Sequence, residues 1–354
     1  MDARAMNGQR HIVGVMMVTL SLLLSGCAGM FQDPHVSLIR EPGYRTYNPP
    51  EPVSHSARAL WEYAVLSENA YVDQWGEPGL TPAEQTARVS RVPPATPEAY
   101  VSACRPDHGG RLPLPGWTMW SNFPSASLRE KAREVGLYVE VWERNASPPV
   151  VAVVFRGTEA ASWKDWVSNF RWFLRFVPLY PDQYTVVARD VGNEVLADLK
   201  RKIEGGREHY KAVQIVTTGH SLGGGLAQHL AYALPPVTTA GGTVLPRVSN
   251  VYGFDPSPVT GWYSVSRTLR TANAEGLKID RVFEHGEVLA YLRLILRYLN
   301  PPSARDPSIR EIRYNFVDSI NPFSSHSMRL IACSLIDASG QATIPAVGEK
   351  FQTR

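Results

Sequence analysis

A serine surrounded by glycines lies where the hydrophobic pattern of the chain changes, and this junction constrains the fold most. Residues 213–217 have the apolar pattern of a strand, and residues 226–234 have that of a helix, which ends before Pro235. Between them lies the sequence GHSLGGG at 219–225. The glycines allow the strand and the helix to approach each other without Cβ clashes. The junction therefore predicts a tight strand–turn–helix unit with Ser221 in a strained turn.

This unit is typical of a serine nucleophile. The first turn of the following helix would stabilise the negative charge that develops beside the serine during attack. A glycine-rich turn between a strand and a helix is also typical of phosphate binding. However, no Lys follows the glycines here, as it does in a Walker loop. We therefore interpret Ser221 as a nucleophile.

Segments on both sides of the junction alternate between strand and helix patterns. Residues 150–155 form a continuous apolar run, typical of a strand buried on both faces. Residues 187–203 carry an apolar side chain at every fourth position, typical of one helix face. Hydrophobic residues make up 44% of the 354 residues, which is enough for a sizeable core. The alternation predicts an α/β fold with a mostly parallel central sheet and helices on both faces.

Charge and cysteine content exclude several other classes of protein. The net charge is +3, with both signs spread along the chain and no block of Lys or Arg, so a nucleic-acid partner is not expected. The chain has no metal-ligand spacing such as CxxC, and we predict neither a metal nor a cofactor. Three cysteines are too few for a disulfide scaffold. Cys104 and Cys333 either pair in an oxidising compartment or remain buried thiols, and the sequence leaves both open.

Three motifs together resemble the class 3 lipase family of α/β-hydrolases: FRGT at 155–158, DWVSNF at 165–170 and GHSLGGGLA at 219–227. The resemblance implies an α/β-hydrolase fold and hydrolysis of carboxylic esters through an acyl-serine intermediate. It also implies an oxyanion hole that consists of the backbone N–H groups of Thr158 and Leu222. This agrees with the expected strand at 150–155, whose end lies beside the turn that carries the serine in such sheets.

A serine hydroxyl needs a base, and the base needs an orienting carboxylate. In this fold class the order along the chain is Ser, acid, His. His229 lies within the expected helix after Ser221, from which it cannot easily return to the serine. His326 follows a strand expected at 312–317, and the resemblance places the family's histidine in a late loop of this kind. We therefore assign His326 as the general base and interpret His220 as structural.

The acid has three candidates. The family usually carries an Asp in a segment of the type VNxxDxVP, and the corresponding segment here, 282–289, has Glu287 at the Asp position. Glu is chemically adequate, although its extra methylene requires the loop to lie slightly further back. Asp255, after a strand expected at 248–253, and Glu284 are the alternatives. Glu287 is our assignment, and the other two stay open.

Aromatic residues crowd the segment directly after the expected oxyanion turn: Trp163, Trp166, Phe170, Trp172, Phe173, Phe176 and Tyr180. The resemblance places a lid over the active site at this position. The alternative is a helix whose aromatic face is buried in the core.

The N-terminus predicts export. Arg4 and Arg10 precede an apolar run of 13 residues at 12–24, which is short for a membrane span of roughly 20. The run ends in LSGC at 24–27, which resembles the lipobox of bacterial lipoproteins and implies cleavage after residue 26 and acylation of Cys27. Two or three acyl chains anchor a protein stably to a membrane. Ala28 favours the outer membrane, with the protein in the periplasm or at that membrane.

These predictions divide the chain into a signal peptide (1–26), a Pro/Gly-rich tether (27–55) and a lipase-like domain (56–354). We expect a membrane-anchored lipoprotein that hydrolyses the esters of acylglycerols or phospholipids, as triacylglycerol lipases hydrolyse theirs. The same residues fit a phospholipase A1, a thioesterase or an acyltransferase. An anchored protein that keeps the fold and has lost catalysis is the alternative from a different class.

Overall fold

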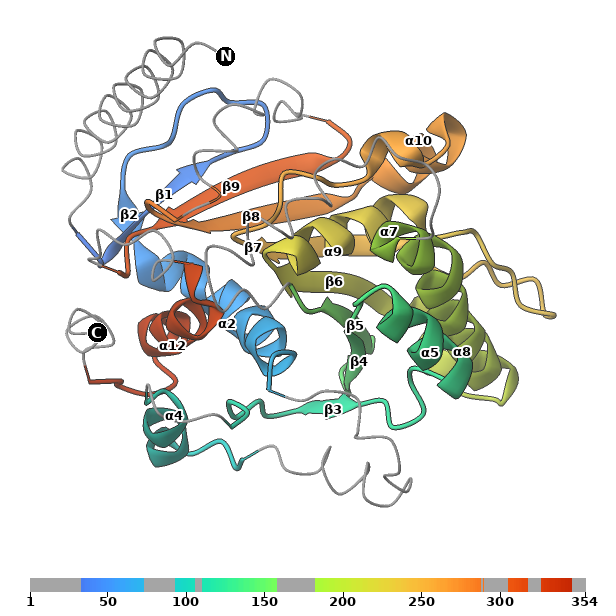
Figure 1. The fold of residues 1–354 in the computed structure, drawn as a ribbon, viewed down its shortest axis with the longest axis horizontal. Helices are drawn as coiled ribbons and strands as arrows, with labels where there is room; N and C mark the ends of the chain where they lie inside the picture. Colours follow the sequence, from blue (N-terminus) through green and yellow to red (C-terminus); the bar gives the residue numbers. More distant parts are fainter. Residues whose placement is uncertain are drawn as a thin grey trace, which may run out of the picture.

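The computed structural model describes residues 33–72, 93–105, 110–157, 182–287, 289, 305–317 and 326–345 (Figure 1). Within these residues nine strands form one sheet in the order β2-β1-β9-β8-β7-β6-β5-β4-β3. The strands are β1 (Val36–Arg40), β2 (Glu51–Pro52), β3 (Trp117–Met119), β4 (Val139–Arg144), β5 (Val150–Phe155), β6 (Gln214–His220), β7 (Val248–Phe254), β8 (Lys278–Glu284) and β9 (Ser308–Tyr314). Neighbouring strands from β5 to β9 are parallel, and the outer pairs are antiparallel.

Helices cover both faces of the sheet (Figure 1). One face carries α2 (Val53–Asn69), α4 (Pro97–Ala103) and α12 (Met328–Ser339). The other carries α5 (Ala126–Glu134), α7 (Gln183–Val186), α8 (Gly192–Glu204), α9 (Leu222–Ala233) and α10 (Arg267–Ala274). This arrangement, with a strand–turn–helix unit between β6 and α9, confirms the predicted α/β-hydrolase fold.

The central strands are buried on both faces because their side chains alternate between two hydrophobic cores. In β5, Val151, Val153 and Phe155 pack under the α8 and α9 side. Their neighbours Val150, Ala152 and Val154 pack under α2 and α12. Every residue of β5 is therefore apolar, as the sequence predicted. The parallel pairing also brings the carboxyl ends of β5 to β9 to one edge of the sheet, where ligands bind in open α/β sheets.

The structure departs from the predicted tether over its second half. Residues 36–40 form β1, which pairs antiparallel with β9 and buries Leu38 and Ile39. The next strand, β2, leads directly into α2, which begins at Val53 rather than after residue 55. Proline and glycine in this segment make the turns between these short elements, and the apolar pair Leu38 and Ile39 fixes the strand to the sheet. The signal peptide and the lipobox lie outside the described residues.

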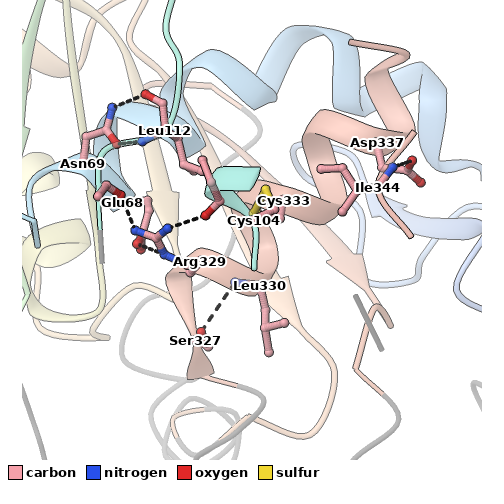
Figure 2. Close-up of a disulfide and its surroundings, with 12 residues drawn as sticks. Glu68, Asn69, Cys104, Leu112, Ser327, Arg329, Leu330, Cys333, Asp337 and Ile344 are labelled. Carbon is pink, nitrogen blue, oxygen red and sulfur yellow. Dashed lines mark hydrogen bonds and ion pairs between the residues drawn. A yellow bond between two sulfur atoms is a disulfide. The ribbon is translucent and has the colours of Figure 1, made fainter. Parts of the chain in front are cut away.

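A disulfide joins Cys104, directly after α4, to Cys333 in α12 across a sequence separation of 229 residues (Figure 2). This settles the pairing that the sequence left open. Within the described part of the chain, no helix combines the length and the hydropathy that crossing a membrane requires.

Candidate active site

The serine of the GHSLGGG motif lies at the tip of a sharp turn between β6 and α9. Ser221 has φ 55° and ψ −125°, a conformation that non-glycine residues rarely adopt. Its backbone N–H donates to the carbonyl oxygen of Phe254 at 2.9 Å, and its carbonyl oxygen accepts from the N–H groups of Gly224 and Ser257. These bonds hold the strained backbone in place, as the motif predicted.

Close backbone contacts explain the glycines of the motif. A Cβ on Gly223 would lie 2.2 Å from the carbonyl oxygen of Phe155, and one on Gly219 would lie 2.5 Å from the backbone carbon of Gly223. Both distances are far below van der Waals contact, and both partners are backbone atoms that a rotamer change cannot move. The turn therefore requires glycine at these two positions.

The end of β5 lies against the same turn. A Cβ on Gly157 would lie 3.0 Å from the Cβ of Ser221 and 2.5 Å from the carbonyl oxygen of His220. Leu222 is the first residue of α9, where backbone N–H groups have no partner within the helix. The structure thus brings residues 155–157 of the FRGT motif against the turn that carries Ser221. Thr158 itself lies outside the described residues.

His220 is tied to a tyrosine that the sequence analysis did not single out. The hydroxyl of Tyr71, just after α2, lies 2.8 Å from Nδ1 of His220 and accepts the backbone N–H of Gly157 at 3.1 Å. Since that hydroxyl already accepts one hydrogen, it can donate its own to Nδ1 of His220. Burial, reinforced by the charge of His326, holds the pKa of His220 well below its usual range. His220 is therefore a neutral acceptor, in agreement with the structural role predicted for it.

His326 lies immediately before the Ser327 cap of α12, and its ring centroid is 4.5 Å from that of His220. Its Nδ1 lies 3.0 Å from Oε2 of Glu287 and 3.7 Å from Oδ2 of Asp255. Both carboxylates are completely buried. A hydrogen bond from Nδ1 to Glu287 leaves Nε2 as the acceptor that a general base needs. The structure thus brings His326 and two of the three candidate acids together beside the serine turn.

The loop after β8 explains how Glu287 returns to the histidine. Gly286 has φ 73°, which turns the chain back toward the sheet. Oε2 of Glu287 also accepts the backbone N–H of Leu289 at 2.7 Å. This backbone contact orients the Glu287 side chain and fixes the orientation of its carboxylate toward the His326 ring.

The third candidate acid, Glu284, has different surroundings. It ends β8, is 1% exposed, and its Oε1 accepts the backbone N–H of Val317 at 3.1 Å. Burial raises the pKa of Glu284 to about 8, and the charge of Asp255 acts in the same direction. A carboxyl group that is mostly protonated at neutral pH is a poor partner for an imidazolium ion. Glu284 is thus the weakest of the three candidates.

His220, Asp255 and His326 also form the kind of group that can bind a metal ion, with one ligand atom from each within 4.8 Å of the others. Two imidazoles and a carboxylate suit several divalent metals. Nδ1 of His220 contacts Tyr71, and Nδ1 of His326 contacts Glu287. Contacts of this kind orient imidazole rings both in proton-transfer systems and in metal sites. Cys27 and the aromatic residues at 163–180 lie outside the described residues.

Residues 152–240 match the sequence family described as Lipase (class 3). The matched segment includes the serine turn and α9, but it ends before Asp255, Glu287 and His326. The match supports a lipase-like hydrolase. No curated protein matches the chain.

Solved structures of fungal lipases are similar to the chain at low identity. The lipase from Rhizopus microsporus var. chinensis is 15% identical with a TM-score of 0.34, over 67% of this chain and 69% of that one. A complex of the Rhizomucor miehei lipase with its propeptide is 14% identical with a TM-score of 0.35, over 75% of this chain and 71% of that one. With TM-scores this low, we assign the fold from the sheet order and the serine turn of this chain itself.

Proposed function

We propose that this protein is a serine hydrolase that cleaves the carboxylic esters of lipids, as triacylglycerol lipases do. The observation that carries the proposal is the 3.0 Å contact between Nδ1 of His326 and the buried carboxylate of Glu287, next to a serine in a strained turn. A base oriented in this way is what an unactivated serine hydroxyl needs before it can attack an ester.

The proposed reaction proceeds through an acyl-enzyme. Nε2 of His326 takes the hydroxyl proton of Ser221 while Oγ of Ser221 forms a bond to the ester carbonyl carbon. Glu287 stabilises the resulting imidazolium, and the backbone N–H groups of Thr158 and Leu222 bind the oxyanion. The imidazolium then protonates the leaving alcohol as the carbon–oxygen bond breaks. Water, deprotonated by His326, releases the carboxylic acid and restores the serine.

A fluorophosphonate probe and a series of p-nitrophenyl esters test this proposal. The wild-type protein should label at Ser221 and hydrolyse the esters. Ser221→Ala should abolish labelling and reduce turnover by roughly 10⁵–10⁶-fold, the loss typical of a missing serine nucleophile. Ser339→Ala is the matched control, because its hydroxyl only bonds the Ile336 carbonyl at the end of α12. A wild-type protein that neither labels nor turns over would show that the fold has lost catalysis.

The acyl-chain series also separates the alternative substrates. A preference for long-chain p-nitrophenyl esters supports lipid substrates, and comparison of acylglycerols, phospholipids and acyl thioesters then distinguishes a triacylglycerol lipase from a phospholipase A1 or a thioesterase. Transfer of the acyl group to an added alcohol in place of water would identify an acyltransferase.

We also propose that the protein is exported and anchored to a membrane through acylation of Cys27. The disulfide supports export, because such bonds persist in oxidising compartments. Replacement of Cys27 with Ala should move the protein from the detergent phase to the soluble fraction and leave ester hydrolysis unchanged. Retention in the membrane fraction after this change would overturn the lipobox prediction.

A further inference from the structure

Backbone strain marks a second position in the site besides the nucleophile. Among the residues that the structure describes, the non-glycine residues with positive φ are Ser221, at 55°, and Asp255, at 39°. They directly follow the ends of the adjacent parallel strands β6 and β7. Such a conformation costs free energy and persists only where the surroundings hold it, which is commonly at a functional site.

Both ends of Asp255 are fixed to the neighbouring strand β8. Its backbone N–H donates to the carbonyl oxygen of Val282 at 2.7 Å, and its Oδ1 accepts the backbone N–H of Glu284 at 2.8 Å. With Oδ1 held in this way, Oδ2 lies 3.7 Å from Nδ1 of His326. The strained backbone thus presents one carboxylate oxygen to the histidine.

The loop that begins at Asp255 is also packed on the serine turn. The backbone N–H of Ser257 donates to the carbonyl oxygen of Ser221 at 2.8 Å. A Cβ on Gly224 would lie only 2.7 Å from the side chain of Pro256. The position of Asp255 is therefore coupled to the position of the nucleophile through two contacts of its own loop.

Glu287 occupies the closer position on the same nitrogen of His326. One imidazole N–H thus faces two completely buried carboxyl groups that come from two successive loops. A single carboxylate is enough to orient a neutral imidazole. A second one adds stabilisation specifically when the ring gains a proton, because the attraction of a buried cation to nearby negative charge is strong at low dielectric.

We propose that Asp255 is a positioning residue, a second carboxylate that acts on His326 together with Glu287. This inference rests on the proposed function and deepens it. Glu287 accepts the Nδ1 hydrogen, and Asp255, 3.7 Å from the same nitrogen, stabilises the imidazolium formed when Nε2 takes the serine proton. The assignment also explains why Asp255 keeps a positive φ, which costs free energy and is uncommon in loop residues without a function.

The other titratable groups around His326 do not supply this charge. His220, on β6, stays neutral because burial lowers its pKa. Glu284, at the end of β8, bonds the backbone N–H of Val317, and burial raises its pKa to about 8. The Tyr71 hydroxyl contacts Nδ1 of His220 and the backbone N–H of Gly157. Removal of Asp255 or of Glu287 should therefore change the charge that His326 experiences, and the pH profile of hydrolysis reports that change.

The test compares Asp255→Asn, Glu287→Gln and the double variant with the wild-type protein on a soluble p-nitrophenyl ester. Asn at 255 can still accept the Glu284 N–H and is among the residues that tolerate positive φ, so the fold should survive. Asp255→Gly, which keeps the backbone conformation and removes the carboxylate, is the second variant. Asp280→Asn is the matched control, because that carboxylate lies on β8, four residues before Glu284, and pairs with Arg310 on β9.

We expect Asp255→Asn to lower kcat about 10-fold and Glu287→Gln about 100-fold, with little change in KM, and the double variant to approach the roughly 10⁴-fold loss of a missing triad acid. Each single change should move the acidic limb of the kcat/KM profile to lower pH, because an imidazolium with less negative charge nearby loses its proton more readily.

The inference is overturned if both Asp255 variants keep the wild-type kcat and pH profile, or if either single change is as severe as the double change. The second result would mean that one acid acts alone. Fluorophosphonate labelling of the same proteins separates these outcomes from failure of the proposed function. If the wild-type protein neither labels nor turns over, the proposed function fails, and this inference fails with it.

Discussion

The proposed nucleophile and the proposed base are held in different ways. Ser221 is fixed by backbone atoms of its own motif and of the strands beside it, at distances that only glycine allows. His326 lies two residues before α12, a helix whose Arg329 contacts distant parts of the chain (Figure 2). Arg329 bonds a carboxylate oxygen of Glu68 at 2.7 Å and the carbonyl oxygens of Ala103 and Gly110 at 2.7 and 2.8 Å.

This difference separates what a local sequence encodes from what only the fold creates. The turn around Ser221 is specified within a few residues, because its geometry depends on missing Cβ atoms. The position of α12 depends on contacts with α2 and with the segment that follows α4, and the disulfide adds a covalent link between them. We therefore expect a substitution in the Ser221 turn to abolish hydrolysis outright. The loss of one contact of α12 should lower stability and leave hydrolysis partly intact.

The largest combined effect on stability and hydrolysis should come from Gly223→Ala. The new Cβ would lie 2.2 Å from the Phe155 carbonyl oxygen and within 2.9 Å of two more backbone atoms, so the turn cannot form without displacing β5. We expect a loss of more than about 3 kcal/mol in the free energy of unfolding, the upper range for overpacking, together with loss of hydrolysis. Urea unfolding followed by circular dichroism measures the first quantity.

Gly241→Ala is the matched control for this substitution. The nearest atom to its new Cβ would be the Thr239 hydroxyl at 4.0 Å, and its φ is not positive. We expect a change within about 0.5 kcal/mol, as for other surface substitutions. If Gly223→Ala unfolds at the same urea concentration as this control, the close contacts of the turn do not specify it.

Removal of the disulfide should have the next largest effect, which falls on stability rather than on hydrolysis at low temperature. Replacing both Cys104 and Cys333 with Ala opens a loop of 229 residues, for which the chain-entropy argument gives a loss of about 5 kcal/mol and measured cases give about 2–5 kcal/mol. Because α12 begins two residues after His326, hydrolysis should decline at a lower temperature than in the wild type, while the rate at 20 °C stays within a few fold.

Loss of thermal stability with unchanged activity at low temperature would show that the disulfide stabilises the fold and does not take part in the reaction. Arg329 and its three partners would still hold the start of α12 in this variant. An immediate and complete loss of hydrolysis at 20 °C would show that the disulfide alone positions the histidine. The same experiment with a reductant in place of the substitutions provides an independent check.

The accuracy of the sequence predictions follows the same division. Residues 150–155 were predicted to the residue, because a continuous apolar run can hardly be anything but a doubly buried strand. The strand at Val36–Arg40 was missed, because its hydrophobic residues are few and its partner β9 lies more than two hundred residues away. Tyr71 was missed for a related reason. No local pattern shows that the residue after a helix reaches the motif at 219–225.

The choice of acid could be narrowed from the sequence but not decided. Glu287 and Asp255 follow adjacent parallel strands, and the carboxyl ends of such strands meet at one edge. Position along the chain therefore allows both to reach His326, and the structure brings both there. Only Glu284 could be excluded as the triad acid, because its burial, which the sequence does not show, raises its pKa to about 8.

The smallest effect on stability should come from Tyr71→Phe, which removes one hydroxyl group beside the serine turn. The hydroxyl accepts the Gly157 N–H and bonds Nδ1 of His220, so its loss leaves one buried donor and one buried acceptor without this partner. We expect a loss of about 1–2 kcal/mol in unfolding free energy. We also expect kcat to fall roughly 10-fold, or about 1.4 kcal/mol of barrier, because Gly157 directly precedes Thr158, the residue proposed for the oxyanion hole. KM should change little, because both contacts of the hydroxyl are with protein atoms.

Tyr47→Phe controls for the loss of a tyrosine hydroxyl as such. That hydroxyl bonds Oε2 of Glu311 on β9 at 3.2 Å, away from the serine turn. It should lower stability by a similar amount and leave kcat unchanged. If the two variants lose equal stability and both keep full kcat, Tyr71 only supports the fold. A fall in kcat for Tyr71→Phe alone would instead show that Tyr71, just after α2, positions the proposed oxyanion hole for the ester carbonyl.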